Sequence, residues 1–369
     1  MPVRIDRRRL LMGLGIAGLV RPAWGAAGAL RITATGQALL RADVAARPYD
    51  GFAALAARLR SADVVFTELE TALDGPGAGP PQRDAELEHA SGPAVLATLR
   101  ALSVNLVATA GNHAFDLGTG GILSTLAALD AAGLAHAGTG VDRAAAVTPA
   151  VVATPAGRVA LVAMAAGKVR EGGAALDGRP GVNEIRRNAD GSFNAEDEVL
   201  VLSAIARAAG RADIVLAYHH NHYWADDPTA TPPWLAAWAR RCVDAGAHAF
   251  IGHGHPALQG VELYRGRPLL YDLGGLFFQT RTPPGHYPPE AWQSVLAEMT
   301  FRDGRLAALD LVPLALNEMP DTSGDPDSRG LPRLASGDEA AAILDRVIAK
   351  SAAFGTRLVR TGDRAALIV

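Results

Sequence analysis

The stretch VNLVATAGNHAFDLGTGGILSTLAALDAAGLAHAGTG, residues 104–140, decides the fold class. It contains a strand-like apolar run (105–109), a polar turn with the letters GNH (111–113) and then a helix-length apolar run. Two further stretches, ADIVLAYHHNHYW (212–224) and GAHAFIGHGH (246–255), repeat the plan of an apolar run that ends in histidines. Strand-like and helix-like runs in alternation predict an α/β fold.

Three pairs of apolar runs joined by short turns predict β-hairpins within this α/β fold. Their turns lie at residues 155–157, 265–267 and 303–304, and each contains a glycine. Hairpins add antiparallel pairs to a sheet whose other strands are joined through helices, so we expect central mixed β-layers flanked by helices. The main domain is predicted over residues 30–315, and the C-terminal extension, residues 316–369, is predicted to hold one helix.

The N-terminus has the plan of a secretory signal peptide. Arg7, Arg8 and Arg9 precede the apolar stretch 12–20, and small residues end the segment. Paired arginines before two leucines indicate the twin-arginine type of leader. We therefore expect residues 1–27 to be a leader and the mature protein to be periplasmic or secreted.

Composition and charge narrow the classes of partner. The formal net charge is -3, with 20% charged residues, and the sequence lacks the basic stripe that nucleic-acid binding requires. The apolar run of the leader is too short for a bilayer of about 30 Å, and no other stretch is a candidate span. The lone Cys242 cannot form an intramolecular disulfide. We expect no nucleic-acid partner and no stable membrane span once the leader is removed.

Six of the ten histidines fall in three clusters, each after a strand-like run. In α/β proteins the carboxyl ends of the strands form the sheet edge where ligands bind. Neutral imidazole is the commonest metal ligand, so several imidazoles at one edge indicate a metal-centred site. Alternatively, each histidine caps a turn or lies satisfied in the core.

Carboxylates join the imidazoles at these strand ends. Glu68 and Glu70 occupy alternate positions, so both point to one side if the strand continues. By the same rule His220 faces the cleft and His219 faces the opposite side, while glycines flanking His253 let backbone and metal approach closely. The predicted metal ligands are Glu68, Glu70, His220, His253 and His255, and the predicted catalytic residues are Asn112, His113 and His222.

The order of these clusters resembles the CapA family, the poly-γ-glutamate capsule proteins, whose domain resembles the calcineurin-like metallophosphoesterase fold. The matching stretches are ADVVFTELETAL (62–73) and the runs at 104–140, 212–224 and 246–278, the last ending in LLYDLGGLFF. This resemblance implies a layered metallophosphoesterase-like α/β domain with metal-ligand-like residues at the sheet edge. It also implies an exported protein involved with a γ-linked glutamate polymer or a related capsule component.

The chain departs from the family pattern at three positions. The family usually has Asp where this chain has Gln37, Asn-Leu-Glu where it has Glu68-Leu69-Glu70, and Asn where it has Gly275. An amide is a poor anionic ligand, and bridging two cations normally needs an anionic oxygen. We therefore expect one divalent cation per chain, Zn²⁺ or Mn²⁺. Gln37→Asp should raise the metal content towards two, and His253→Ala should remove the metal.

Two functions follow from the resemblance and the site. The first is a metal-dependent hydrolase acting on an amide, an ester or a phosphoester, in which His113 protonates the leaving group or stabilises an oxyanion. The alternative, motivated by Gln37, is a non-catalytic capsule or polyglutamate assembly protein that binds the polymer. The expected partner is thus an anionic polymer or a small-molecule substrate. The candidate carboxylate-binding arginines are Arg47, Arg83, Arg265 and Arg267.

Overall fold

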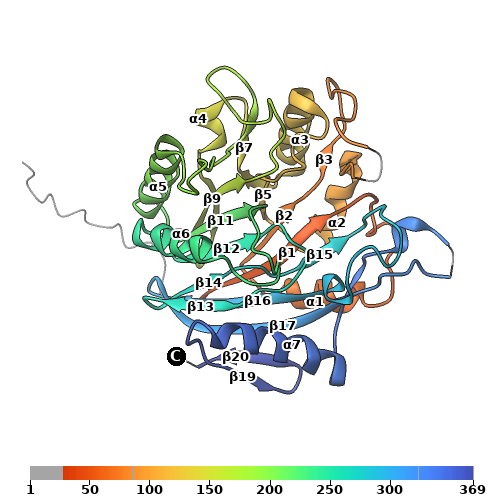
Figure 1. The fold of residues 1–369 in the computed structure, drawn as a ribbon. Coiled ribbons are helices and arrows are strands. Elements are labelled where there is room, and N and C mark those ends of the chain that lie inside the picture. Colours follow the sequence, from red (N-terminus) through yellow and green to blue (C-terminus); the bar gives the residue numbers. More distant parts are fainter. Residues whose placement is uncertain (1–27, 85–86, 323, 369) are drawn as a thin grey trace, which may run out of the picture.

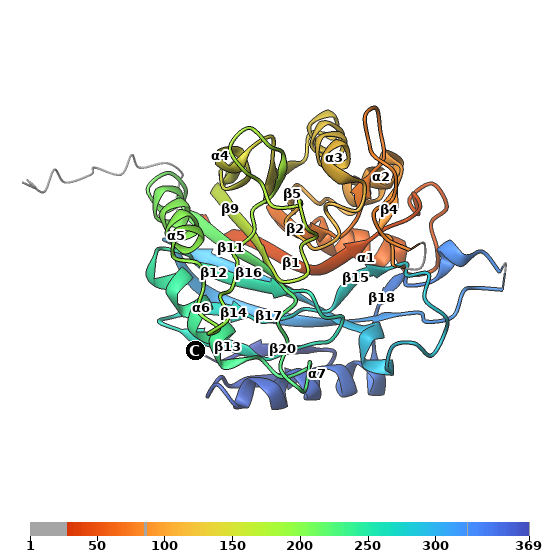
Figure 2. The same ribbon diagram turned by 45° about the horizontal axis from the view of Figure 1, so that its top comes forward.

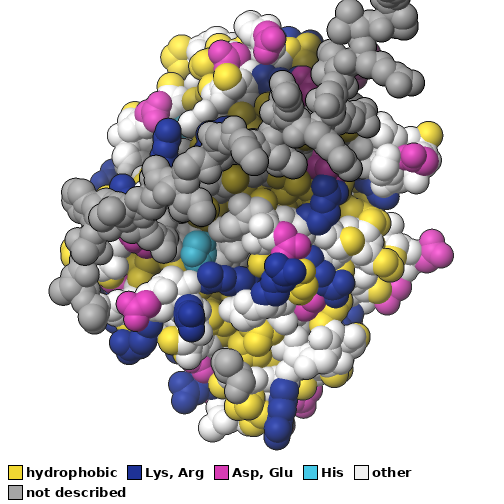
Figure 3. All heavy atoms as spheres, turned by 90° about the vertical axis from the view of Figure 1, so that its left-hand side faces the viewer, with side chains coloured by type: hydrophobic (Ala, Val, Ile, Leu, Met, Phe, Trp, Pro, Cys, Tyr) yellow, Lys and Arg dark blue, Asp and Glu magenta, His cyan; other side chains and the backbone are white. Residues whose placement is uncertain are grey.

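A computed structural model describes residues 28–84, 87–322 and 324–368 (Figure 1). The predicted leader, residues 1–27, lies outside the described residues. Within the part of the chain that is described, no helix combines the length and apolar character needed to cross a bilayer. Basic and acidic side chains both occur on the face that Figure 3 draws, with hydrophobic side chains between them.

The larger sheet has ten strands, with β1 near its centre. Its main path runs β19-β20-β17-β16-β1-β2-β5-β6, while β15 pairs with β1 and β18 with β17. The strands are β1 (Leu30–Leu39), β2 (Val64–Leu69), β5 (Leu106–Ala108), β6 (Ala135–Ala137), β15 (Gly275–Phe278), β16 (Gln293–Arg302), β17 (Arg305–Leu316), β18 (Pro332–Leu334), β19 (Leu358–Thr361) and β20 (Arg364–Leu367).

The smaller sheet has six strands in the order β13-β14-β12-β11-β9-β8. These are β8 (Ala150–Thr154), β9 (Gly157–Ala166), β11 (Ile214–Asn221), β12 (Ala249–His253), β13 (Val261–Tyr264) and β14 (Arg267–Leu270). Two separate pairs join β3 (Ala72–Leu73) to β4 (Ala90–Ser91) and β7 (Thr139–Gly140) to β10 (Gly181–Val182).

Helices cover the outer faces of both sheets, which pack against each other (Figures 1 and 2). Apolar residues of both sheets, such as Phe66, Leu216 and Met299, form the buried cluster between them. The helices are α1 (Phe52–Leu59), α2 (Leu96–Ala101), α3 (Gly118–Ala132), α4 (Arg143–Ala146), α5 (Ala195–Ala209), α6 (Pro233–Asp244) and α7 (Gly337–Ala352), with 3₁₀ turns at Pro93–Val95, Pro289–Trp292 and Pro326–Ser328.

Each outer layer has its own apolar contacts. Helices α1 and α2 pack on the larger sheet through residues such as Leu55 and Leu99. Helices α5 and α6 pack on the smaller sheet through Ile205 and Trp238, beside the buried Cys242. In the larger sheet β1-β2-β5-β6 run parallel, whereas β16 pairs antiparallel with β1 and β17. In the smaller sheet β9-β11-β12 run parallel, whereas β8 pairs antiparallel with β9 and β13 with β14, so both sheets are mixed. The predicted layered α/β class with mixed sheets and flanking helices is confirmed.

All three predicted hairpins form. They are β8–β9, β13–β14 and β16–β17. In two of them both turn residues have positive φ, at Arg265 (50°) and Gly266 (72°) and at Asp303 (50°) and Gly304 (71°). These angles suit the type I′ turn, whose twist matches that of the strands it joins. Beyond β17, the chain adds α7 and three short strands, of which β18 and β20 pair with β17.

Candidate metal centre

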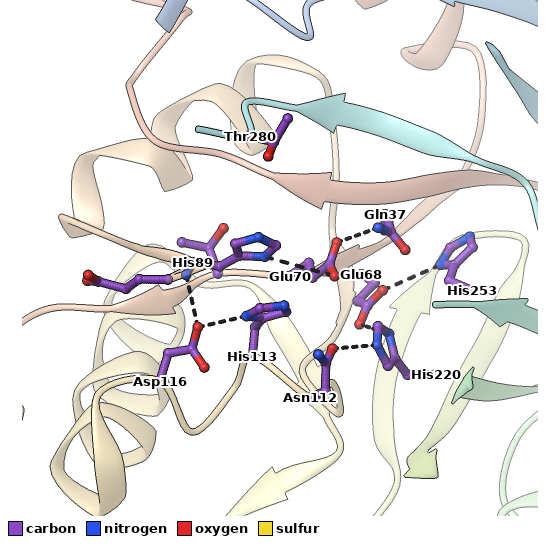
Figure 4. Close-up of polar contacts among 12 residues, drawn as sticks. Gln37, Glu68, Glu70, His89, Asn112, His113, Asp116, His220, His253 and Thr280 are labelled. Atoms are coloured by element: carbon purple, nitrogen blue, oxygen red, sulfur yellow. Dashed lines mark hydrogen bonds and ion pairs between the residues drawn. The ribbon is translucent and has the colours of Figure 1, made fainter. Parts of the chain in front are cut away.

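The site forms where strands of both sheets end. Glu68 of β2 lies in register with Gln37 of β1, and His220 of β11 lies in register with His253 of β12. Within the smaller sheet the ends of β11 and β12 approach closely: a Cβ on Gly254 (φ 125°), the residue after β12, would lie 2.1 Å from the carbonyl oxygen of Asn221 in β11. Figure 4 shows the two carboxylates between the His89–His113 pair and the His220–His253 pair.

Glu70, His89 and His113 form the first group. One potential ligand atom from each lies within 4.8 Å of the other two, which is close enough for one metal ion. The rings of His89 and His113 stack with centroids 3.5 Å apart, and His89 Nδ1 lies 3.9 Å from Glu70 Oε1. Burial lowers the pKa of both histidines well below the ordinary value, with the charges of neighbouring His113 and Arg83 acting in the same direction. Both rings are therefore neutral at pH 7, the form that binds metal.

Asp116 orients this group. Its carboxylate lies 2.7 Å from His113 Nδ1, and it accepts from the His89 backbone N–H at 2.9 Å and from Arg83 Nε at 2.5 Å. Arg83 also donates to the Asn112 carbonyl oxygen at 2.6 Å. A carboxylate on Nδ1 fixes the tautomer of a histidine and leaves Nε2 as the metal-binding atom. Asp116 therefore prepares His113 to act as a ligand.

Glu68, His220 and His253 form a second, fully buried group. Glu68 Oε1 lies 2.7 Å from His220 Nδ1, and Glu68 Oε2 lies 3.7 Å from His253 Nδ1. His220 Nε2 lies 2.8 Å from Asn112 Oδ1, so both nitrogens of His220 have partners. Burial alone would raise the pKa of Glu68, but His220 and then His253 outweigh it and hold that pKa below the ordinary value.

Gln37 contacts the first group. Its Nε2 donates to Glu70 Oε2, while its Oε1 is buried without a hydrogen-bond partner. Burial, followed by the charge of Glu68, raises the pKa of Glu70 well above the ordinary value. The amide of Gln37 therefore contacts one oxygen of Glu70, while the other oxygen lies on the side of His89 Nδ1.

A cavity of about 180 Å³ opens onto Gln37 and the Glu70–His89–His113 group. His222, Trp224 and His255 also line it. Neither ring nitrogen of His222 has a hydrogen-bond partner in the described part of the chain, and burial lowers the pKa of His222 well below the ordinary value. Burial likewise lowers the pKa of His255 to about 4.

The predicted site residues therefore divide into groups. Glu70 and His113 share the metal-sized group with His89, whereas Glu68, His220 and His253 cluster behind it and His222 and His255 lie on the cavity wall. Among the described residues, the predicted ligands do not form one group with ligand atoms within 4.8 Å of each other. His219 points the other way, as expected, and accepts from Trp238 Nε1 at 3.0 Å.

Sequence reasoning missed His89 and the role of Asp116. His89 precedes the two-residue strand β4 and follows a Gly- and Pro-rich loop, so no strand-end pattern marks it. Asp116 lies three residues after His113, a spacing that brings the two side chains together in the turn that precedes α3. That spacing is the signal that could have identified Asp116.

Comparison with known proteins decides the family. Residues 31–280 match the bacterial capsule synthesis protein family PGA_cap. The chain belongs to this family. A probable polyglutamine synthesis accessory protein of Mycobacterium tuberculosis is 31% identical to this chain over 70% of this chain and 67% of its own length.

Two other similar proteins differ in coverage. An uncharacterised protein of Sinorhizobium fredii is 28% identical over 91% of this chain and 92% of its own. The capsule biosynthesis protein CapA of Bacillus anthracis is 33% identical over 35% of this chain and 30% of its own. Among solved structures, the NAD nucleotidase of Haemophilus influenzae is 12% identical, covers 86% of this chain and 55% of its own, and gives a TM-score of 0.39.

The donor set fits a divalent cation. Two neutral imidazoles and a carboxylate are ligands that Zn²⁺ accepts and Mn²⁺ tolerates. Among the described residues, the buried His89 Nδ1 has no hydrogen-bond partner, which is expected of a metal-binding nitrogen. Glu70, His89 and His113 are therefore a candidate metal site in this member of the capsule synthesis family.

Proposed function

We propose that this chain is an exported, metal-dependent hydrolase of capsule biosynthesis that acts on an amide, an ester or a phosphoester. A γ-glutamyl polymer or another capsule component is the proposed substrate. The observation that carries the proposal is that the Glu70–His89–His113 group lies on the wall of an open cavity. Buried structural histidines would not need access to solvent.

The residues of the cavity wall have distinct roles in this proposal. Glu70, His89 and His113 hold one divalent cation, which supplies a Lewis acid when bound. Asp116 holds the ring of His113 in its metal-binding tautomer. His222, neutral and without a hydrogen-bond partner for either ring nitrogen among the described residues, is placed to hydrogen-bond to a bound substrate. Glu68 is closed off by His220 and His253 and takes no part in proton transfer.

One observation favours the alternative, a capsule-assembly protein that binds polymer without turnover. Gln37 Nε2 donates a hydrogen bond to Glu70 Oε2, so one of the two carboxylate oxygens that a cation could bind already has a partner. In a protein without metal, this contact would stabilise the site by itself. The two proposals therefore differ in whether the purified protein contains metal.

Elemental analysis of purified protein tests the proposal. Wild type should contain about one Zn²⁺ or Mn²⁺ per chain, and His89→Ala should lose it because a ligand is missing. His136→Ala is the control, because His136 contacts Asp130 away from the cavity. Gln37→Asp should raise the metal content towards two.

The outcomes separate the readings. Loss of metal in His253→Ala but not in His89→Ala would favour the ligands predicted from sequence. Wild-type protein without metal, and without any effect of chelators on turnover, would favour the polymer-binding protein. Two metals per wild-type chain would contradict the role given to Gln37.

A further inference from the structure

Lys168 stands in a strained turn beside the cavity. It follows β9 at the same sheet edge as the site, and Gly167 (φ 81°) and Lys168 (φ 54°) both have left-handed backbone conformations. A side chain other than glycine is uncommon there and persists only where the surroundings hold it. The turn packs on the next strand end: His222 N–H donates to the Ala166 carbonyl at 2.8 Å, and a Cβ on Gly167 would lie 3.1 Å from the Tyr223 ring.

This turn places a cation over an aromatic wall of the cavity. Lys168 Nζ lies 4.7 Å from the centroid of the Trp224 ring. Trp224 lines the cavity, remains 37% exposed and packs against the rings of His222 and His255, with centroids 4.9 and 4.8 Å away. Its Nε1 donates to the Asn221 carbonyl at 2.9 Å, which fixes the ring.

The loop that follows Trp224 is held at several points. Lys350 of α7 donates to the carbonyl and hydroxyl of Thr229 at 2.9 and 2.7 Å. Gln259 accepts from the Thr231 hydroxyl at 2.9 Å and donates to the Pro228 carbonyl at 3.2 Å. Trp224 is thus a preformed wall.

Lys168 has no carboxylate within ion-pair distance among the described residues, in contrast to the arginines that the sequence suggested as anion binders. Arg83 pairs with Asp116 and Arg265 with Asp244, while Arg47 lies 3.6 Å from Asp325. Arg267 donates to the Gly304 carbonyl. An exposed ammonium next to a cavity, without a protein counter-charge, is available to a ligand.

We propose that Lys168, Trp224 and His222 form a substrate subsite beside the candidate metal centre. This subsite binds an anionic oxygen group, either a carboxylate or a phosphate, together with the hydrocarbon next to that group. Lys168 supplies the charge, His222 a hydrogen bond from its unpartnered ring, and Trp224 an apolar wall. This proposal rests on the proposed function only because the subsite and the candidate metal centre share one cavity.

Calorimetric binding tests the subsite without requiring turnover. The probes are an N-acetylated γ-linked triglutamate, the same compound with its carboxylates converted to amides, and inorganic phosphate. Lys168→Met should weaken triglutamate or phosphate binding about five- to tenfold, leave the neutral compound unaffected and reduce the dependence on salt. If wild type turns over the anionic substrate, Lys168→Met should raise KM and leave kcat nearly unchanged.

Arg265→Met is the matched control. Arg265 also has positive φ, 50°, and lies over an aromatic ring, Tyr264, at 5.3 Å, but it pairs with Asp244. Equal binding by wild type and Lys168→Met, or equal weakening by Arg265→Met, would overturn the subsite. If the protein shows no turnover but binds the anionic probes in a way that depends on Lys168, the subsite is supported and the proposed hydrolase function is contradicted. Binding of phosphate but not of triglutamate would identify the anionic group as phosphate.

Discussion

Glu68 and Glu70 lie two residues apart, but their surroundings shift their pKa values in opposite directions. Two imidazoles lower the pKa of Glu68, whereas burial and the neighbouring charge of Glu68 raise that of Glu70. Two adjacent carboxylates with opposite shifts are typical of a functional site. Glu70 is thus the carboxylate that gains from a cation, and it is also the one that faces the cavity.

Glu184 gives a pH test of stability away from this site. It lies in a small pocket with Arg186 and Asp197, and burial raises its pKa to about 6 from 4.5, against the charge of Arg186. A raised carboxyl pKa favours the native state at low pH, and this contribution is lost as the pH rises from 4.5 to about 6. Glu184→Gln should therefore stabilise the protein by about 1 kcal/mol at pH 8 and have little effect at pH 4.5.

Urea unfolding at both pH values measures this difference. Glu171→Gln is the control, because Glu171 is exposed. An equal change in the free energy of unfolding at pH 8 and pH 4.5 would show that the desolvated charge of Glu184 is not the cause.

The periodicity of the sequence predicts that Glu70 belongs to the candidate site, but it does not predict that His89 does. Glu68 in β2 and Glu70, one residue after β2, occupy alternate positions, and this local pattern predicts their shared side. His89 reaches the site only because β4 pairs with β3, which extends the chain beyond β2. That pairing depends on the 16 residues between the two strands, 74–89, which have no periodic signal of their own.

At the scale of elements, Gly254 tests how tightly β11 and β12 must approach. Its φ of 125° excludes other residues, and its added Cβ would lie 2.1 Å from the Asn221 carbonyl oxygen. Gly254→Ala should destabilise the protein by at least about 2 kcal/mol in thermal or denaturant unfolding. Gly266→Ala is the control: φ is 72° there, but nothing lies within 4 Å, so about 1 kcal/mol is expected. Equal effects would mean that backbone strain alone, not contact, requires Gly254.

The elements predicted from sequence are those with local signals. The hairpins β8–β9 and β16–β17 have turn residues between two apolar runs, and α3 ends at Gly133, whose φ is 67°. Strand β15 was missed, since it has four residues and pairs with β1, more than 200 residues earlier. Strands β18 to β20 have three or four residues each, too few for alternation to show.

At the scale of the whole molecule, α7 completes the central core. Its residues Ile343, Leu344 and Val347 are buried in the cluster that also lies between the sheets. Each such side chain contributes about 1.5–3 kcal/mol, so their sum approaches the total stability of a typical domain. A chain ending after residue 336 should lack a cooperative thermal transition, and Ile343→Ala should cost about 2–5 kcal/mol. A truncated protein with an unchanged melting temperature would show instead that the extension folds as a separate unit.

Strand β1 also sets the order in which the protein is built. One edge of β1 pairs with β2, which leaves the ribosome soon afterwards, but the other pairs with β15 and β16, with Leu30 opposite Phe301. At roughly 5–20 residues per second, Phe301 of β16 is synthesised roughly 14–54 seconds after Leu30 of β1. For that interval an apolar strand has an unpaired edge, which is open to other nascent chains. Slower translation lengthens this interval and should therefore lower the yield of soluble protein while the finished fold stays the same.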